Sequence, residues 1–371
     1  MQKDLLASFL HLFHCFGNKR AAFVALLDYF NVDPGNADPG RVVEAGLSQL
    51  TASGLKPDLI RAIRQAQHPQ VSRDLAWARQ PGNHLVCFLD PAYPALLRQI
   101  DDFPVLLYAR GNIDLLHNPQ IAIVGSRLCT PGGAQTAIDF SSQLAGCGLT
   151  ITSGMALGID TQAHLGALRV DAATIAVNGT GLDRIYPPRN ASLARDIMEK
   201  GLLVSEFPLG TQANRHSFPQ RNRIISGLSL ATLVVEAAAR SGSLITARLA
   251  AEQGREVFAI PGSIHNPQTR GCHRLIRDGA KLVEQVGDIT EELGSLLGFM
   301  LEQVGESKPG PSTNLDREHR NLLETIAYDP VNLDALVQRS GLTIDKLSSM
   351  LLVLELNNLI QSAPGGCFVR I

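Results

Sequence analysis

A short polar segment, residues 214–229 (NRHSFPQRNRIISGLS), contains the residue types that bind single-stranded nucleic acid. Its one large aromatic residue, Phe218, is flanked by three arginines: Arg215, Arg221 and Arg223. Guanidinium groups can follow a phosphate backbone, and an exposed ring offers a surface on which a base stacks. The alternative is structural, with Phe218 packed beneath a sheet and the arginines paired with acids elsewhere in the chain.

The charge around this segment is unevenly distributed. Residues 205–281 contain ten Lys or Arg against five Asp or Glu, a local net charge of +5 in a chain whose formal net charge is -2. The overall balance predicts no general attraction to nucleic acid, so any basic surface must be local. This local excess favours an anionic partner.

A second candidate is the segment IAIVGSR, residues 121–127. Its apolar run is typical of a buried parallel strand that ends in a turn toward a helix. Backbone N–H groups at the start of a helix suit a bound anion, and Ser126 and Arg127 would add a hydroxyl and a guanidinium. The alternative is an ordinary turn between a strand and a helix, with Arg127 as a surface charge.

A third candidate is ARSGS, in which Ser241, Gly242 and Ser243 lie where a helix is expected to begin. Unpaired N–H groups and hydroxyls would converge there and could hold a phosphate. A serine that simply caps the helix explains the same residues.

The sequence contains few candidate catalytic residues. Asp160 and His164 are four residues apart on an expected helix but lack a neighbouring nucleophile motif. A helix cap and a buried histidine with satisfied hydrogen bonds are therefore the preferred interpretation. The phosphate-loop and dinucleotide-binding fingerprints are absent. Six scattered cysteines, with no CxxC pair, predict free thiols and no metal or other cofactor. We also expect no signal peptide and no membrane span, hence a cytoplasmic protein.

The elements that must position these residues form three parts of the chain, and a linker separates the second part from the third. Residues 1–78 are expected to be helical, and residues 79–300 alternate between strands and helices. The strands are expected at 85–89, 121–125, 149–154, 174–179, 202–207, 231–237 and 256–262. This alternation predicts an open, mostly parallel α/β sheet with helices on both faces. Because ligands bind at the carboxyl ends of such strands, the candidate segments should share one groove.

The C-terminal part, residues 315–371, follows a linker at 301–314. Helices are expected at 316–327, 333–339 and 344–356, before a short hairpin, which together predict a winged helix. This part contains five basic and seven acidic residues, and its last helix is mostly apolar. We therefore expect a protein contact or a regulatory lid rather than binding of duplex DNA.

With these segments in view, the chain resembles the DNA-processing protein A family (DprA, also called Smf). The similarity rests on blocks in one order along the chain: GSR, SGMALGIDTQAH, GTGLDRIYP, SEFPLG, FPQRNRIISGLS, VVEAAARSGSLITA and GREVFAIPGS. The resemblance implies an extended Rossmann-like domain, an N-terminal sterile-alpha-motif-like (SAM-like) helical domain and a C-terminal winged helix. It also implies a homodimer without established catalysis that binds and protects incoming single-stranded DNA in natural transformation. Its implied protein partners are the RecA recombinase and the single-strand-binding protein.

The family's pocket, transferred residue by residue, implies specific DNA contacts. They are Ser126 and Arg127 for phosphate, Phe218 for base stacking, Arg221 and Asn222, and Arg215 for the backbone. Two positions depart from the family pattern. Where some members have a lysine after YP, this chain has Pro188 followed by Arg189, so Arg189 is expected to make that DNA contact one place later. Leu157 replaces a basic residue found in some members.

The sequence therefore predicts a protein that binds single-stranded DNA without strong sequence preference, and the resemblance implies that it loads a recombinase. A nucleotide-processing enzyme with a Rossmann-like fold is the alternative, with Glu206 and Glu236, both at strand ends, as its candidate acids. A further alternative is a duplex-binding regulator that acts through the winged helix, which the net charge of that part opposes.

Overall fold

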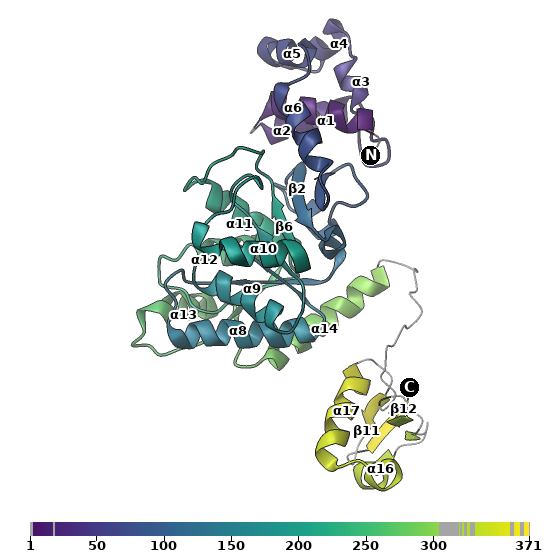
Figure 1. The fold of residues 1–371 in the computed structure, drawn as a ribbon, viewed down its shortest axis with the longest axis vertical. Helices are drawn as coiled ribbons and strands as arrows, with labels where there is room; N and C mark the ends of the chain where they lie inside the picture. Colours follow the sequence, from purple (N-terminus) through teal and green to yellow (C-terminus); the bar gives the residue numbers. More distant parts are fainter. Residues whose placement is uncertain are drawn as a thin grey trace. The chain divides into compact units, whose positions relative to one another are not determined.

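The computed structural model describes residues 3–17, 19–303, 319, 321–322, 325–326, 331–356, 360–363 and 367–370. The chain divides into two compact units, Met1–Phe299 and Met300–Ile371 (Figure 1). The N-terminal helices and the large sheet both belong to the first unit. The domain boundary expected at residue 78 therefore lies inside one compact body.

Six helices open the chain. They are α1 (Lys3–Phe16), α2 (Arg20–Tyr29), α3 (Gly40–Val43), α4 (Leu47–Ala52), α5 (Pro57–Arg64) and α6 (Pro69–Ala78). Phe9 on α1 is fully buried and meets Phe23 on α2 edge to face, with ring centroids 5.4 Å apart. The Phe9 ring also lies 6.3 Å from that of Phe88, beyond the first strand of the sheet. The helices and the sheet thus share one hydrophobic core.

The strands of the first unit form a nine-stranded sheet among the described residues. They are β1 (Asn83–Cys87), β2 (Leu106–Gly111), β3 (Gln120–Val124), β4 (Thr150–Ser153), β5 (Thr174–Val177), β6 (Leu202–Ser205), β7 (Ala231–Val234), β8 (Glu256–Ala259) and β9 (Lys281–Leu282). All seven expected strands are confirmed, while β2 and β9 were not expected. Strands β3 to β9 pair in parallel, and β1 and β2 add an antiparallel edge beside β6.

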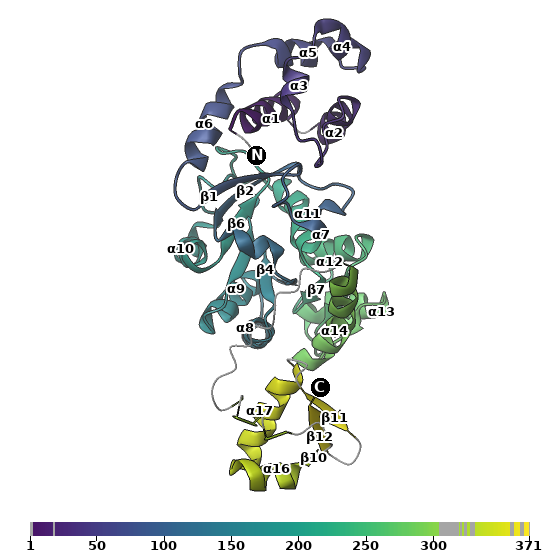
Figure 2. The same ribbon diagram turned by 90° about the vertical axis from the view of Figure 1, so that its right-hand side faces the viewer.

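Helices cover both faces of this sheet (Figure 2). In that view α8 (Pro131–Gly146), α9 (Ile159–Arg169) and α10 (Ala191–Lys200) lie on one side. The other side holds α7 (Ala95–Arg98), α11 (Ser217–Leu228), α12 (Ser243–Glu252), α13 (Arg270–Arg277) and α14 (Val286–Gln303). Short 3₁₀ turns occur at Ile113–His117, Pro188–Asn190 and Pro267–Thr269. The expected α/β architecture is confirmed.

The strand order places a crevice at the centre of the sheet. The order is β1-β2-β6-β5-β4-β3-β7-β8-β9, so the chain leaves β3 toward β4 but leaves β7 toward β8, in the opposite direction. The ends of β3 and β7 are adjacent, with Val124 paired to Val234. A reversal of this kind separates the two following loops and opens a ligand crevice at the carboxyl ends of the strands.

Among its described residues, the second unit contains a three-stranded sheet, ordered β10-β12-β11, with helices beside it in the sequence. Its described elements are β10 (Val331–Asn332), α16 (Leu333–Ser340), α17 (Ile344–Leu356), β11 (Ile360–Ala363) and β12 (Cys367–Arg370). Asn332 caps α16, since its side chain accepts the Ala335 N–H at 2.8 Å. The expected helices at 333–339 and 344–356 and the hairpin are confirmed. The linker at 301–314 and the helix at 316–327 lie mostly outside the described residues.

We find no helix, in the part of the chain that the structure describes, with the length and apolar character needed to cross a bilayer.

Candidate nucleic-acid interface

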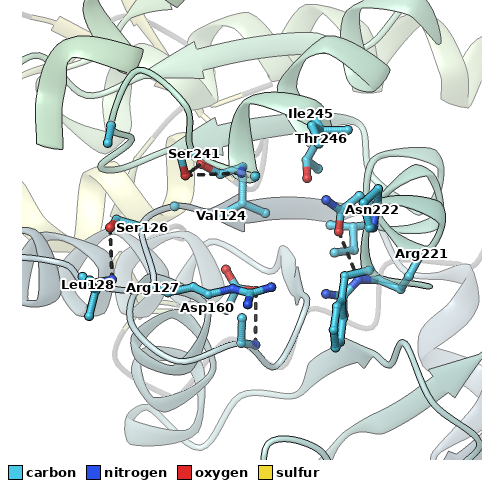
Figure 3. A pocket seen from close by; sticks show the side chains of 18 of the residues that line it. Val124, Ser126, Arg127, Leu128, Asp160, Arg221, Asn222, Ser241, Ile245 and Thr246 are labelled. Carbon is cyan, nitrogen blue, oxygen red and sulfur yellow. Dashed lines mark hydrogen bonds between the residues drawn. The ribbon is translucent and has the colours of Figure 1, made fainter. Parts of the chain in front are cut away.

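A pocket of about 770 Å³ opens at the carboxyl ends of β3 and β7 (Figure 3). Its walls are the turn after β3, the start of α11, the segment before α12 and the start of α12 itself. Residues from all three candidate segments line it, including Ser126, Arg127, Arg215, Phe218, Arg221, Asn222, Ser241, Gly242 and Ser243. The expectation that these segments meet in one groove is confirmed.

The turn after β3 presents Arg127 to the pocket. Ser126 is buried, and its hydroxyl accepts the Leu128 N–H at 3.1 Å and donates to Gln268 Oε1 at 3.0 Å. A Cβ atom at Gly158 would lie 2.2 Å from the Ser126 carbonyl oxygen, so only glycine permits this packing. The Ser126 hydroxyl therefore shapes the turn, and its own hydrogen bonds compete with any bond to a phosphate.

Arg127 itself is exposed, and its guanidinium carbon lies 5.4 Å from the centre of the Phe218 ring. Figure 3 shows its side chain reaching across the pocket toward α11. No carboxylate among the described residues forms an ion pair with Arg127. Its charge is thus available to an anionic ligand beside an aromatic surface.

The start of α8 differs from the expectation that its backbone N–H groups face a bound anion. The carboxylate of Glu236, buried at the end of β7, already occupies that position. It accepts the Thr130 N–H at 2.8 Å and the Thr130 hydroxyl at 2.6 Å, and the Thr130 hydroxyl in turn accepts the Gly133 N–H. A protein carboxylate therefore satisfies this helix end, and the turn offers Arg127 rather than a backbone cradle.

Helix α11 places an aromatic pair at the mouth of the pocket. Phe218, partly exposed, stacks on Tyr186 with ring centroids 5.5 Å apart and an interplanar angle of 29°. Tyr186 is 42% exposed and also lines the pocket. No ligand contact was assigned to Tyr186 from the sequence. Its loop has no periodicity, and nothing local shows that the fold brings it to Phe218.

Arg221 forms the buried floor beneath this pair. Its Nη1 donates to the Gly154 carbonyl at 2.6 Å and to the Val177 carbonyl, and its Nε donates to Asn222 Oδ1 at 3.1 Å. Burial lowers the pKa of Arg221 to about 10, which still leaves it charged at neutral pH. The hydrogen bond from Arg221 Nε turns the side-chain oxygen of Asn222 toward Arg221. The amide N–H groups of Asn222 therefore stay available as donors to a ligand.

Two predicted contacts lie elsewhere. Arg223 is buried outside the pocket lining, where it pairs with Glu206 and, through its Nε at 3.0 Å, with Asp102. This bears out the structural alternative for that arginine. Arg189 is exposed in a 3₁₀ turn but is not part of the pocket lining. We include neither residue in the proposed contact surface.

The segment before α12 forms the opposite wall. The helix begins at Ser243, and the Ser241 and Ser243 hydroxyls lie 2.8 Å apart within hydrogen-bonding distance. Arg240, which belongs to the candidate segment ARSGS but was not counted among the expected contacts, is exposed on this wall, as is Ile245. Hydroxyls, a guanidinium and an apolar side chain thus line the wall that faces Phe218.

The electrostatic balance of the pocket is positive. Four arginines line it, Arg127, Arg215, Arg221 and Arg240, against one acid, Asp160. Asp160 is fully buried in the first turn of α9, and burial raises the pKa of its carboxyl while the nearby Arg221 opposes that rise. Such a pocket attracts an anion, and its exposed rings suit a planar group attached to that anion.

His164, the other half of the catalytic pair considered from the sequence, is not a pocket residue. It is fully buried and its Nδ1 lies 2.8 Å from the Thr174 hydroxyl. Burial lowers the pKa of His164 to about 3. The expected burial of this residue is confirmed, but its Nε2 has no hydrogen-bond partner among the described residues, so the expectation of a fully satisfied histidine is wrong. Among the described residues, no three His, Cys, Asp or Glu side chains are arranged to hold a metal ion.

Comparison with known proteins identifies relatives of both units. The family model described as DNA recombination-mediator protein A matches residues 84–294, and that of the DprA winged helix domain matches residues 306–366. The protein Smf of Escherichia coli K12 is 42% identical over 317 residues, covering 83% of this chain and 84% of that protein. The DNA processing protein DprA of Streptococcus pneumoniae R6 is 50% identical over 204 residues, covering 55% of this chain and 72% of that protein.

Solved structures give the same result. The X-ray structure of DprA from Streptococcus pneumoniae has a TM-score of 0.68 at 39% identity and covers 77% of this chain and 97% of that chain. A structure of DprA from Helicobacter pylori, described as giving insight into its single-stranded DNA binding mode, has a TM-score of 0.51 at 32% identity and covers 54% of this chain and 93% of that chain. The central sheet, the winged helix and these similarities together show that the chain belongs to the DprA/Smf family of DNA-processing proteins.

Proposed function

We propose that this protein binds single-stranded DNA in the pocket between β3 and β7, as a recombination mediator. The observation that supports this most directly is the stacked, partly exposed Phe218–Tyr186 pair beside Arg127 in a pocket lined by four arginines. A base can stack on the rings only when it is not paired within a duplex, while the arginines neutralise the adjoining phosphates. The pocket thus favours a single strand, with little dependence on base identity.

The solved relative from Helicobacter pylori supports this proposal, since that protein has a described single-stranded DNA binding mode. In our proposal Arg127, Arg215 and Arg240 contact phosphates, Phe218 and Tyr186 receive a base, and Asn222 donates to the base or sugar. Arg221 acts from below, by fixing Asn222 and adding charge. Ser241, Gly242 and Ser243 border the path of the strand.

We extend the proposal to the cellular role through family membership. In this role a cytoplasmic homodimer protects incoming DNA during natural transformation, displaces single-strand-binding protein and loads the RecA recombinase. Family membership and the open, solvent-facing pocket support this role.

We infer that the protein works by binding rather than by catalysis. The nucleotide-processing alternative depended on Glu206 and Glu236, and neither lines the pocket. Glu206 pairs with Arg223, and Glu236 is engaged by Thr130. Both carboxylates are therefore committed to holding the fold, which leaves neither as an acid or base for a bound nucleotide.

Removing the C-terminal unit should leave single-strand binding nearly intact. A chain ending at residue 304 retains every pocket residue, so its affinity for a labelled oligothymidine should stay within about threefold of the full chain, a difference below 1 kcal/mol. Fluorescence anisotropy of the two proteins at one salt concentration measures this. A loss of a hundredfold or more would assign the binding surface to the winged helix instead.

The recombinase-loading role makes a separate prediction. The wild-type protein should shorten the lag before RecA hydrolyses ATP on a circular single strand coated with single-strand-binding protein. Phe218→Ala should not shorten it, because a mediator that cannot hold the strand cannot open the coat. A wild-type protein that binds oligothymidine but leaves the lag unchanged would contradict RecA loading without affecting the binding proposal.

A further inference from the structure

Two loops contribute residues to the pocket, and the N-terminal helices contact both loops. Pocket loop 1, residues 178–187, contains Tyr186, and pocket loop 2, residues 206–216, contains Arg215 and leads directly into α11. None of the residues of α1 to α6 lines the pocket. Their contacts with these loops therefore act on the site only through the loops.

Helix α6 holds the two loops together. Gln70 Nε2 donates to the Leu209 carbonyl of pocket loop 2 at 3.2 Å, and Arg73 Nη2 lies 3.4 Å from Asp183 Oδ2 of pocket loop 1. Asp183 in turn accepts the Gly210 N–H at 2.8 Å through its other oxygen. One carboxylate thus bridges both loops and an arginine of the N-terminal helices.

Helix α2 reaches α11 by a second route. Arg20 Nε donates to the Phe103 carbonyl at 2.8 Å and lies 3.1 Å from Asp102 Oδ1, with its guanidinium 4.4 Å over the Phe103 ring. The other oxygen of Asp102 accepts from Arg223 Nε at 3.0 Å, and Arg223 also pairs with Glu206 at the start of pocket loop 2. The Arg223 and Glu206 side chains are only 8% and 11% exposed.

Helix α11 connects this network to the site. Arg221 and Arg223 are two residues apart, so their side chains point about 200° apart around the helix. Arg221 and its neighbour Asn222 face the pocket, while Arg223 faces the segment that Arg20 holds. Because one rigid helix bears both groups, the ion pairs of Arg223 set the rotation at which Phe218 and Asn222 meet a ligand.

We propose that the N-terminal helices brace the single-strand site: through Arg20 and Arg73 they hold α11 and both pocket loops in the binding arrangement without touching DNA. This inference rests on the proposed function. A flexible loop loses conformational entropy when it becomes ordered on binding, and this loss lowers the affinity. Loops that the N-terminal helices already hold in order avoid that loss. Coupling is reciprocal, so a strand bound in the pocket also stabilises the packing of α2 and α6.

Two substitutions in the full chain test the brace, each with oligothymidine binding measured over a salt series. Arg20→Met should weaken binding about three- to tenfold, and Arg73→Met, at an exposed ion pair, about two- to fivefold. Neither should change the slope of log affinity against log salt, since no phosphate contact is lost. Arg61→Met is the matched control. This control removes the same charge from α5. The Arg61 side chain is 72% exposed, and its ion-pair partner, Asp58, belongs to the same helix. The affinity of Arg61→Met for oligothymidine should therefore equal that of the wild type.

Hydrogen exchange supplies the reciprocal measurement. Oligothymidine should slow exchange of the amides of α6 and pocket loop 2 in the wild type. This protection of α6 should be weaker in Arg73→Met, which keeps only the Gln70 contact to pocket loop 2 and folds normally because the lost pair is exposed. Affinities of both variants within the error of the wild type would overturn the brace. A salt slope shallower by about 0.7 would also overturn it, because that change marks a lost phosphate contact. A wild-type protein that does not bind oligothymidine would refute the proposed function itself.

Discussion

Replacing Phe218 with alanine should weaken binding of oligothymidine by about ten- to a hundredfold and leave its salt dependence almost unchanged. The ring provides the stacking surface at the pocket mouth, and a stacked base is worth about 1–3 kcal/mol. The loss also deprives Tyr186 of its partner at 5.5 Å and Arg127 of the ring beneath its guanidinium. No positive charge is removed, so the number of neutralised phosphates stays the same.

Phe218→Tyr is the matched control, because it retains the ring and should bind within about threefold of the wild type, or about 0.7 kcal/mol. Anisotropy titrations of the three proteins over a range of salt concentrations separate the two effects. Equal affinity for Phe218→Ala and the wild type would remove stacking from the account. A large change of slope in Phe218→Ala would instead show that the ring acts by holding Arg127 in place.

Arg127→Ala should produce the complementary pattern. We expect binding about tenfold weaker at low salt, with a slope of log affinity against log salt shallower by about 0.7, as for the loss of one phosphate contact on a single strand. The physical reason is that Arg127 is exposed, unpaired by any described carboxylate and directed into the pocket. At high salt the difference from the wild type should shrink, because the released counterions contribute less.

Arg195→Ala provides the control for Arg127→Ala. Arg195 is exposed on α10 and does not line the pocket, so its removal changes the net charge by the same amount at a different place. It should leave both the affinity and the slope within error of the wild type. An equal loss in both variants would mean that the protein attracts DNA through its overall field rather than through a defined site.

The central sheet was predictable because its parallel strands are buried on both faces. Residues 121–124 and 231–234 are continuous apolar or nearly apolar runs. Such a run identifies a buried strand from its own residues, without knowledge of the strands that pair with it. Strand β2 was missed because it pairs antiparallel near the edge of the sheet and does not belong to the regular alternation of strands and helices. Strand β9 was missed because it has only two residues. Neither gap affects the crevice, which depends on β3 and β7.

The site was predictable only in part. The predicted parallel sheet brought the segments of Arg127, Phe218 and Arg221 to one edge. It gave no sign that Glu236 fills the start of α8 from 106 residues away in the chain. Arg223 could have been excluded from the site once α11 was known to be helical, since it faces away from Arg221. Tyr186 could not have been included from its own loop, because its contact with Phe218 is purely tertiary.

The most direct test of the account compares labelled oligothymidine with a duplex of equal length, bound by the wild-type full chain across a salt series. The stacked rings require an unpaired base, whereas the arginines alone would accept any phosphate backbone. We therefore expect the single strand to bind at least tenfold more tightly than the duplex, and this preference to persist as salt weakens both. Equal affinity for the two DNAs at every salt concentration would contradict the single-strand pocket.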